Sequence, residues 1–264
     1  MTSILAATVI LLRHGPGGVP ELLMVERDSK LAFAGGALVF PGGRIDEADI
    51  ATARNPDLAF GFETLDDTDA AARIACAREA LEETGVLLTF GPAPDPVSLA
   101  EARAMLSEGP DSAEACTFAA LLAGLGHKVS AARFLPFARW EPPLAAPIKR
   151  RFDTLFYLAD AEQTASAAIS PDGNEAVAIH WSTAQAVLDR AAKGEAALVF
   201  PTQCNLERLA QYATIEALMT ATAAMAPPYI QPEIVTRDGE PWITIPEGKD
   251  YPVTAGRISS LRRE

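Results

Sequence analysis

Three glutamates stand close together in residues 78–86, which read REALEETGV. Residues three and four apart in a helix share one face, so Glu79, Glu82 and Glu83 would crowd together in its last two turns. Like charges at these spacings cost about 0.2–0.5 kcal/mol per pair, and the negative C-terminal end of the helix dipole adds a similar penalty. A hard divalent cation such as Mg²⁺ or Mn²⁺ would turn this penalty into a gain, because carboxylate oxygens are its preferred ligands.

The same cluster also has an ordinary explanation, which is a solvated acidic helix end. In that case Arg78 would offset part of the charge by pairing with Glu82. The upstream sequence FPGGR favours a function, because a strand that breaks into a Pro-Gly-Gly turn lets a backbone carbonyl approach a cation without side-chain obstruction. Charge and spacing alone leave both explanations open.

The glycines and the glutamate helix together resemble the Nudix box, whose pattern is G-x5-E-x7-R-E-U-x-E-E-x-G-U with U a bulky aliphatic residue. The matching positions are Gly43, Arg78, Glu79, Glu82, Glu83, Gly85 and Val86. Ala80 departs mildly from the pattern, because it is small where a larger aliphatic residue is usual.

The spacing departs further from the pattern. Residues 44–77 number 34 where the pattern has 13, so about 21 extra residues lie inside the box. The position eight residues before Arg78 is Ala70, so the first glutamate of the pattern is missing there. Asp69, Asp66 or an acid within residues 46–49 are the candidates to replace it.

One Nudix branch carries such an insertion, and the chain resembles it over most of its length. This is the branch of the mammalian peroxisomal coenzyme A diphosphatases and their bacterial relatives. The resemblance implies an α+β Nudix fold, an α/β/α sandwich around a mixed sheet. It also implies a divalent-metal-dependent hydrolase that uses Mg²⁺ or Mn²⁺ to cut the pyrophosphate bond of a nucleoside diphosphate derivative, with coenzyme A or acyl-CoA as the candidate. The alternative is a Nudix-fold module that binds a nucleotide derivative without cutting it.

The resemblance also implies roles within the box. Glu79, Glu83 and the Gly42 carbonyl are expected to hold the metal, and Glu82 to assist in catalysis. Arg78 is expected to orient the glutamates rather than touch the substrate.

Nudix enzymes often add a downstream acid as metal ligand or general base. Our candidate is Glu175, six residues before Trp181, and Asp172 is its competitor, with a role as an ordinary turn residue in PDG as the alternative.

Three basic residues are candidates for substrate binding. Arg27 and Lys30 precede the glycine turn and could contact the substrate's phosphates, with plain surface charge as the alternative. Arg151 belongs to the densest basic spot, KRRFDT, where pairing with Asp153 or a glutamate is the competing explanation. The three histidines are scattered and the three tryptophans lie in apolar strand contexts, so we expect structural roles for both sets.

The element pattern predicts one domain over residues 1–264, with insertions at about 44–69 inside the box and at about 97–125. Residues 46–69 are polar and acidic and are predicted to form a loop. The central helix should begin near residues 66–69 and end at Gly85, burying Ile74, Ala77 and Leu81. Strands are predicted at 4–15, 20–28, 36–41, 86–90, 134–143, 151–160 and 175–183, a hairpin at 233–245, and helices at 95–109, 112–126, 183–194 and 202–224.

Composition excludes several classes. A formal charge of −13 argues against a nucleic-acid-binding surface, and the apolar N-terminal run is too short to span a membrane. Three unevenly spaced cysteines form neither a disulfide framework nor a zinc cluster, and Cys76 should be a buried apolar residue. We therefore expect a cytoplasmic protein with a small-molecule substrate, and its helical C-terminal part is a candidate homodimer surface.

Overall fold

The computed structural model describes residues 3–30, 34–107, 117–144, 146, 150–162, 169–172 and 176–258. Its centre is a mixed sheet with the strand order β10-β7-β8-β1-β2-β3, in which β4 also pairs with β1 and β9 with β2. β1 runs parallel to β8 and antiparallel to β2. The strands of this sheet are β1 (Ile4–His14), β2 (Pro20–Arg27), β3 (Leu38–Val39), β4 (Gly42–Arg44), β7 (Leu135–Trp140), β8 (Phe152–Asp160), β9 (Ala176–Thr183) and β10 (Tyr229–Ile230).

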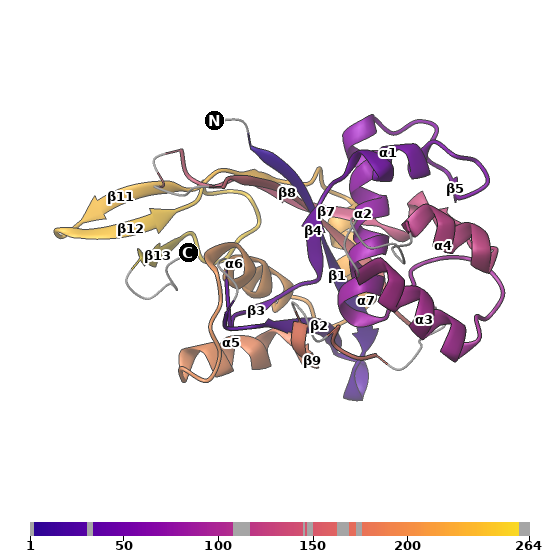
Figure 1. The fold of residues 1–264 in the computed structure, drawn as a ribbon. Coiled ribbons are helices and arrows are strands. Elements are labelled where there is room, and N and C mark those ends of the chain that lie inside the picture. Colours follow the sequence, from indigo (N-terminus) through magenta and orange to yellow (C-terminus); the bar gives the residue numbers. More distant parts are fainter. Residues whose placement is uncertain are drawn as a thin grey trace.

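Helices cover both faces of the sheet, because its central strand is apolar on both sides. Ala7, Val9 and Leu11 of β1 pack into one hydrophobic core, and Ile10 and Leu12 pack into a second core on the opposite face. Figure 1 shows α1 to α4 on one side of the sheet and α5 and α6 on the other. The helices are α1 (Glu47–Ala53), α2 (Asp67–Thr84), α3 (Pro96–Ser107), α4 (Phe118–Leu125), α5 (Ala184–Ala192), α6 (Phe200–Leu209) and α7 (Ile215–Ala223). The predicted α+β fold, a sandwich around a mixed sheet, is confirmed.

Two smaller sheets complete the architecture. β11 (Glu233–Arg237), β12 (Glu240–Thr244) and β13 (Ala255–Arg257) form an antiparallel sheet that extends away from the α1–α4 side (Figure 1). The predicted β11–β12 hairpin is confirmed, with Asp238 and Gly239 at φ of 51° and 80° in its turn. β5 (Ala59–Phe60) pairs in parallel with β6 (Val129–Ser130).

The central helix α2 follows its predicted bounds. The Asp66 side chain caps its start by accepting from the Asp69 amide at 2.8 Å, and Gly85 ends it in the left-handed region at φ 77°. Ile74, Ala77 and Leu81 are fully buried as expected. Cys76 is fully buried too, and burial raises the pKa of its thiol well above the ordinary value, which makes it an inert core residue.

Several element predictions are wrong. Residues 46–69 are not a plain loop, because they contain α1 and β5. Residues 86–90 enter no sheet and make one isolated bridge, Phe90 to Lys128. The predicted helix at 202–224 is broken into α6 and α7, because the Thr214 side chain caps a new helix through the Ala217 amide. Gly42 and Gly43 are not a turn but strand β4, which pairs with residues 6–8 of β1.

The helices predicted at 95–109 and 112–126 are confirmed as α3 and α4, and residues 108–116 between them lie outside the described residues. Among the tryptophans, Trp140 is buried as expected, whereas Trp181 and Trp242 are only partly buried and carry arginine side chains on their rings. His127 is buried and hydrogen-bonded to Thr89 at 2.6 Å, a structural role. In the part of the chain that the structure describes, no helix is long and apolar enough to cross a lipid bilayer.

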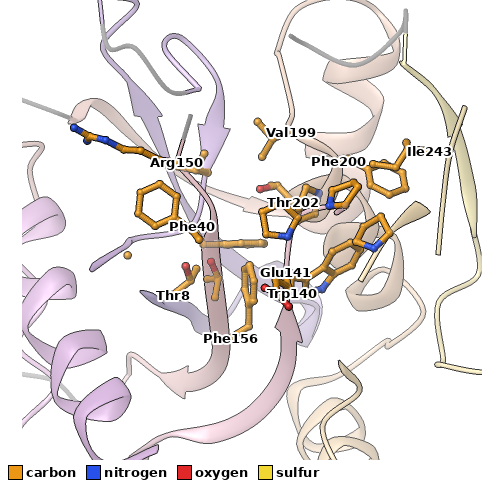
Figure 2. A pocket seen from close by; sticks show the side chains of 18 of the residues that line it. Thr8, Phe40, Trp140, Glu141, Arg150, Phe156, Val199, Phe200, Thr202 and Ile243 are labelled. Carbon is orange, nitrogen blue, oxygen red and sulfur yellow. The ribbon is translucent and has the colours of Figure 1, made fainter. Parts of the chain in front are cut away.

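A cavity of about 200 Å³ lies between the sheet and the start of α6 (Figure 2). Thr8 of β1 and Phe156 of β8 contribute to one wall, and Phe200 of α6 and Ile243 of β12 to the other. Gly42 lines the same cavity, so the cavity opens beside the glycine strand. Strand β4 therefore lies at the boundary between this cavity and helix α2.

Candidate active site

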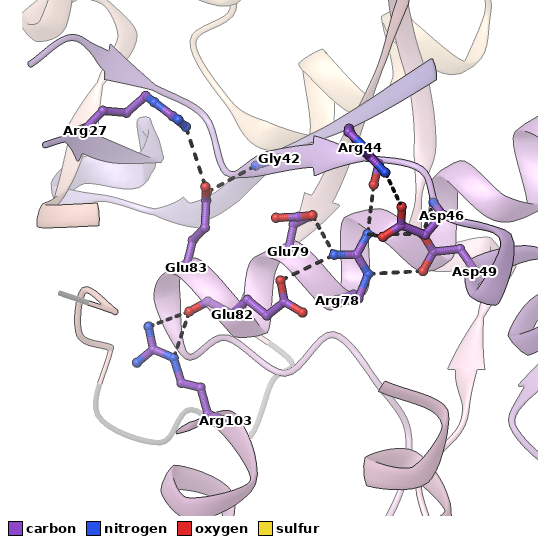
Figure 3. A network of polar contacts seen from close by, with 10 residues as sticks. All are labelled: Arg27, Gly42, Arg44, Asp46, Asp49, Arg78, Glu79, Glu82, Glu83 and Arg103. Carbon is purple, nitrogen blue, oxygen red and sulfur yellow. Dashed lines mark hydrogen bonds and ion pairs between the residues drawn. The ribbon is translucent and has the colours of Figure 1, made fainter. Parts of the chain in front are cut away.

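The glutamate helix and the glycine strand meet in space, although about 35 residues separate them in the sequence. The Gly42 amide donates to Glu83 Oε2 at 3.2 Å (Figure 3). A Cβ atom at position 42 would collide with backbone atoms of Ala7 and Thr8 on β1, so only glycine fits there, and one at position 43 would push against the Glu79 carboxylate. The predicted approach of the two box segments is therefore confirmed, with the amide of Gly42 facing Glu83.

Arg78 holds the acidic face of α2 together. Its guanidinium donates to Glu79 Oε1 at 2.6 Å, to Glu82 Oε2 at 3.3 Å and to the Arg44 carbonyl at 2.9 Å. Burial lowers the pKa of Arg78. The charge of Glu79, together with a hydrogen bond to Asp49 and the charge of Asp49, outweighs burial and raises this pKa above its ordinary value. The predicted pairing of Arg78 with Glu82 is confirmed, and Arg78 orients more than one glutamate.

Asp49 is the acid that the sequence left unidentified. It lies in α1 and is only 2% exposed, and its two carboxylate oxygens each accept from Arg78 at 3.1 Å. Of the other candidates, Asp66 caps α2, and Asp69 accepts from Arg73 and from the Tyr157 hydroxyl. Counting forward from Gly43, Asp49 is the sixth residue, which is where the Nudix pattern places its first glutamate. Counting back from Arg78 reaches Ala70 instead, because the insertion begins after Asp49.

The three glutamates are largely removed from water. Glu79 is 9% exposed and Glu83 is 4% exposed. Burial, and then the neighbouring Glu79 charge, raise the pKa of Glu82 to about 7. The helix end itself is capped by a cation, because the Arg103 guanidinium of α3 donates to the Glu82 carbonyl at 3.0 and 3.1 Å. Arg103 thus compensates the negative C-terminal end of the α2 backbone, whereas the three carboxylates remain a crowded negative cluster.

The residues present fit a hard divalent cation in their chemistry. Buried carboxylates on adjacent turns supply oxygen donors, and the glycine strand leaves no side chain between them and the sheet. In this structure Glu79 forms an ion pair with Arg78. Glu83 accepts a hydrogen bond from the Gly42 amide and forms an ion pair with Arg27. Consistent with this, no three acidic, histidine or cysteine side chains in the described ranges are grouped as a ready-made metal site.

The three basic candidates for substrate binding lie in different surroundings. Arg27 comes to the site, with Nη1 3.9 Å from Glu83 Oε1, and it also lines the cavity. Lys30 is exposed in the turn after β2 and is not among the described residues that line the cavity. Arg151 does not line the cavity either, because its guanidinium donates to the Pro142 and Pro143 carbonyls.

Of the two partners that the sequence offered for Arg151, Asp153 is wrong, whereas a glutamate is supported, because the Arg151 charge is among the causes that lower the pKa of Glu141. Asp153 accepts instead from Arg139 on the neighbouring strand, at 2.5 and 2.8 Å. Arg150, next to Arg151 in the sequence, is the basic residue of this segment that lines the cavity.

Glu175, the candidate downstream acid, lies outside the described residues. Its competitor Asp172 accepts a hydrogen bond from the Ala176 amide at 2.8 Å, as a turn residue does.

Comparison with known proteins places this site in a family. A family model described as the NUDT19 Nudix domain matches residues 61–209, which is more than half of the chain. The chain belongs to this family. The predicted membership of the Nudix hydrolases, in the coenzyme A diphosphatase branch, is thereby confirmed.

Two curated relatives carry the name acyl-coenzyme A diphosphatase NUDT19. The protein from Gallus gallus is 28% identical, over 81% of this chain and 69% of its own length. The protein from Homo sapiens is 29% identical, over 75% of this chain, and the chain spans 62% of that protein. Among solved structures, a Nudix hydrolase from Alicyclobacillus acidocaldarius is similar, with a TM-score of 0.68 and 27% identity over 83% of this chain and 96% of that one.

Proposed function

We propose that this Nudix protein hydrolyses the diphosphate bond of coenzyme A or its thioesters in a reaction that needs Mg²⁺ or Mn²⁺. The observation that carries the proposal is the acidic face of α2, packed on a strand where only glycine fits and held by Arg78. Membership of the NUDT19 Nudix domain family, and the printed names of the two relatives, support the substrate class.

The chain's own residues divide the work as follows. Glu79 and Glu83 would hold the cation with help from Glu82 and the Gly42 carbonyl, and Arg78 would keep the carboxylates in place. A bound divalent cation supplies charge neutralisation at the phosphoryl oxygens and acidifies the attacking water. Arg27 lies between Glu83 and the cavity, where it would hold a diphosphate oxygen.

Two acids are proposed for the water's proton, Glu82 and Glu175. Glu82 stands on the same face of α2 as the proposed ligands and shares Arg78 with Glu79. Glu175 is supported by its place in the sequence alone. Replacing each by glutamine and comparing the rates separates them, because the general base loses far more of kcat than a neighbour does.

The experiment is a substrate panel with the full chain. Coenzyme A, acyl-CoA, ADP-ribose, NADH and diadenosine polyphosphates are incubated with Mg²⁺ or Mn²⁺, and the products are separated by chromatography. We expect the coenzyme A compounds to be cut, Glu83→Gln to abolish turnover, and Glu101→Gln on the exposed face of α3 to behave as wild type. Unchanged turnover in Glu83→Gln would reject Glu83 as an essential ligand.

A module that binds nucleotides without cutting them gives a different result. Such a protein would bind one of the panel compounds in calorimetry yet release no product with either metal. The predicted cytoplasmic location and the predicted homodimer through the C-terminal helices are carried here as further proposals, which cell fractionation and analytical ultracentrifugation would test.

A further inference from the structure

Arg103 of the inserted helix α3 contacts two segments that lie far apart in the sequence. Its guanidinium donates to the Glu82 carbonyl, near the end of α2, at 3.0 and 3.1 Å (Figure 3). It also donates to the Ser170 carbonyl at 2.8 Å and to the Ser170 hydroxyl at 2.9 Å. One side chain of the insertion therefore joins the glutamate helix to residues 169–172, which precede strand β9.

Residues 169–172 are also fastened to α2 directly. The Ser170 amide donates at 3.2 Å to the carbonyl of Thr84, the fully buried last residue of α2. Ile169 packs against the same hydrophobic core as this helix. Arg103 thus completes a joint between the helix end and a second segment, which a cap for the helix alone would not require.

The chain leads from this joint to the other side of the glutamate cluster. The Asp172 carboxylate accepts from the Ala176 amide at 2.8 Å, which ties the start of β9 to the segment before it. Ala176 pairs with Arg27 of β2, whose guanidinium is 3.9 Å from the Glu83 carboxylate. The candidate acid Glu175 directly precedes Ala176 in the sequence. The stretch that begins at the joint is therefore tied at its far end to the glutamate site again.

Arginine suits this joint because the acceptors are neutral and belong to two segments. Nη2 alone donates to both the Glu82 and the Ser170 carbonyls, Nε donates to Glu82, and Nη1 donates to Ser170. Its positive charge is favourable at the C-terminal end of α2, and the Asp172 charge acts on the same guanidinium. A neutral side chain of similar length supplies neither the charge nor the donors.

We propose that Arg103 is a positioning residue for the reaction, which makes the inserted helix α3 part of the framework of the active site. Arg103 holds residues 169–172 against the end of α2, and so it fixes the point from which the chain continues to Ala176 beside Arg27. It acts through Glu82 and Ser170 and touches neither metal nor substrate. Its expected effect on the rate rests on the proposed diphosphatase function, whereas its effect on the structure does not.

The first test is hydrogen exchange, which needs no activity. Arg103→Met keeps the approximate length of the side chain and removes every donor, so amide exchange in residues 169–172 should become at least about tenfold faster. Arg103→Lys should stay within about threefold of wild type, because an ammonium group in the place of Nη2 can donate to both carbonyls. Unchanged exchange in Arg103→Met would overturn the inference, whether or not the protein cuts any coenzyme A compound.

The second test is the rate with a coenzyme A compound that the wild type cuts. Arg103→Met should lower kcat about 10–100-fold, as the loss of a supporting residue around a metal site does, and change KM less than about threefold. Arg103→Lys should recover most of kcat. Wild-type kcat in Arg103→Met, on protein shown to be folded by thermal unfolding, would overturn the positioning role and leave the diphosphatase function standing. A wild type that cuts no compound of the panel contradicts the proposed function instead, and the exchange experiment still decides the inference.

Arg73 provides the matched control. It is also an arginine that donates to two backbone carbonyls beside α2, those of Ala131 and Phe134, but it lies roughly 16 Å from Thr84 along the helix. Arg73→Met should lower Tm at least as much as Arg103→Met does, because Arg73 is buried, and should leave exchange in residues 169–172 within about threefold of wild type. Equal acceleration of this exchange by the two substitutions would show general destabilisation and would sink the proposal.

Discussion

Replacing Asp49 by asparagine tests whether the acid of α1 positions the glutamate helix. The Asp49 and Arg78 side chains are 3% and 13% exposed, so solvent screens their pairing little. Hydrogen bonds to charged groups contribute about 1.5–3 kcal/mol each, and asparagine can keep one of the two. The full 3–5 kcal/mol for breaking a buried ion pair is not reached, because Arg78 retains Glu79 and Glu82.

We therefore expect Asp49→Asn to lower the free energy of unfolding by about 2–3 kcal/mol, or Tm by about 4–12 °C for a chain of this size. With Arg78 less constrained, the proposed metal ligands lose their support, and groups of this kind typically change metal affinity or activity about 10–100-fold. Urea unfolding and the Mg²⁺ concentration that gives half-maximal activity are the two measurements. Asp49→Glu should restore both, because it supplies the acid that the Nudix pattern has at this position.

Asp46 provides the matched control. Its carboxylate is 3.9 Å from Arg78 and 49% exposed, so this pair contributes little. Asp46 also caps α1, and asparagine caps a helix about as well as aspartate. Asp46→Asn should cost less than about 1 kcal/mol. Equal effects of the two substitutions, or an Asp49→Asn protein with unchanged stability and unchanged Mg²⁺ dependence, would refute the positioning role.

Three further outcomes are expected. Gly43→Ala should push the Glu79 carboxylate aside and lower kcat at least tenfold in the diphosphatase assay, because a Cβ atom has no room there. Gly85→Ala should cost about 1–2 kcal/mol in urea unfolding, because alanine must take φ 77° at the end of α2. Tyr229→Phe should raise the lowered pKa of Glu141 toward its ordinary value of 4.5, because only the first of the two hydroxyls that donate to it, those of Ser3 and Tyr229, remains. The free energy of unfolding that Tyr229→Phe removes should be constant above about pH 5, and it should vanish as the pH falls through the lowered pKa of Glu141. Unfolding curves measured from pH 3 to 7 would follow this change.

Local signals were enough to predict the central helix. Asp66 and Gly85 are a cap and a stop that act through neighbouring backbone groups, so α2 begins and ends where the sequence placed it. The break between α6 and α7 also has a local signal in the sequence. Thr214 is a preferred capping residue, and its side chain starts a new helix inside the segment that was predicted as one helix.

Pairings between distant segments could not be predicted in this way. Gly42 and Gly43 have turn composition, yet they form a strand because β1 offers free backbone groups there, about 35 residues away in the sequence. Residues 86–90 have strand composition, yet in the described part of the chain they pair only through the Phe90–Lys128 bridge, and residues 86–88 pack as an irregular segment in the core. Composition described each segment correctly, and the neighbours decided its structure.

The candidate site shows the same division. The glutamates and Arg78 were found from spacing, because three- and four-residue steps on a helix fix which side chains meet. Arg103 gave no signal, since it reaches the helix end from α3, an inserted helix whose packing the sequence did not specify. Arg150 was passed over for Arg151, because two adjacent arginines cannot be told apart until the strand that follows them fixes their directions.

The insertion inside the Nudix box leaves the chemistry intact because its two ends are tied together. Arg54 leaves α1 and donates to the Phe62 carbonyl at 2.9 Å and to Asp67, at the start of α2, at 2.7 Å. Phe62 is buried in the core, so the extra residues fold against the domain and return the chain to α2. Because the cost of closing a loop grows slowly with its length, about 20 added residues cost little once both ends are fixed. The 3.1 Å contact between Asp49 and Arg78, which we propose positions the glutamates, is thereby kept across the inserted residues.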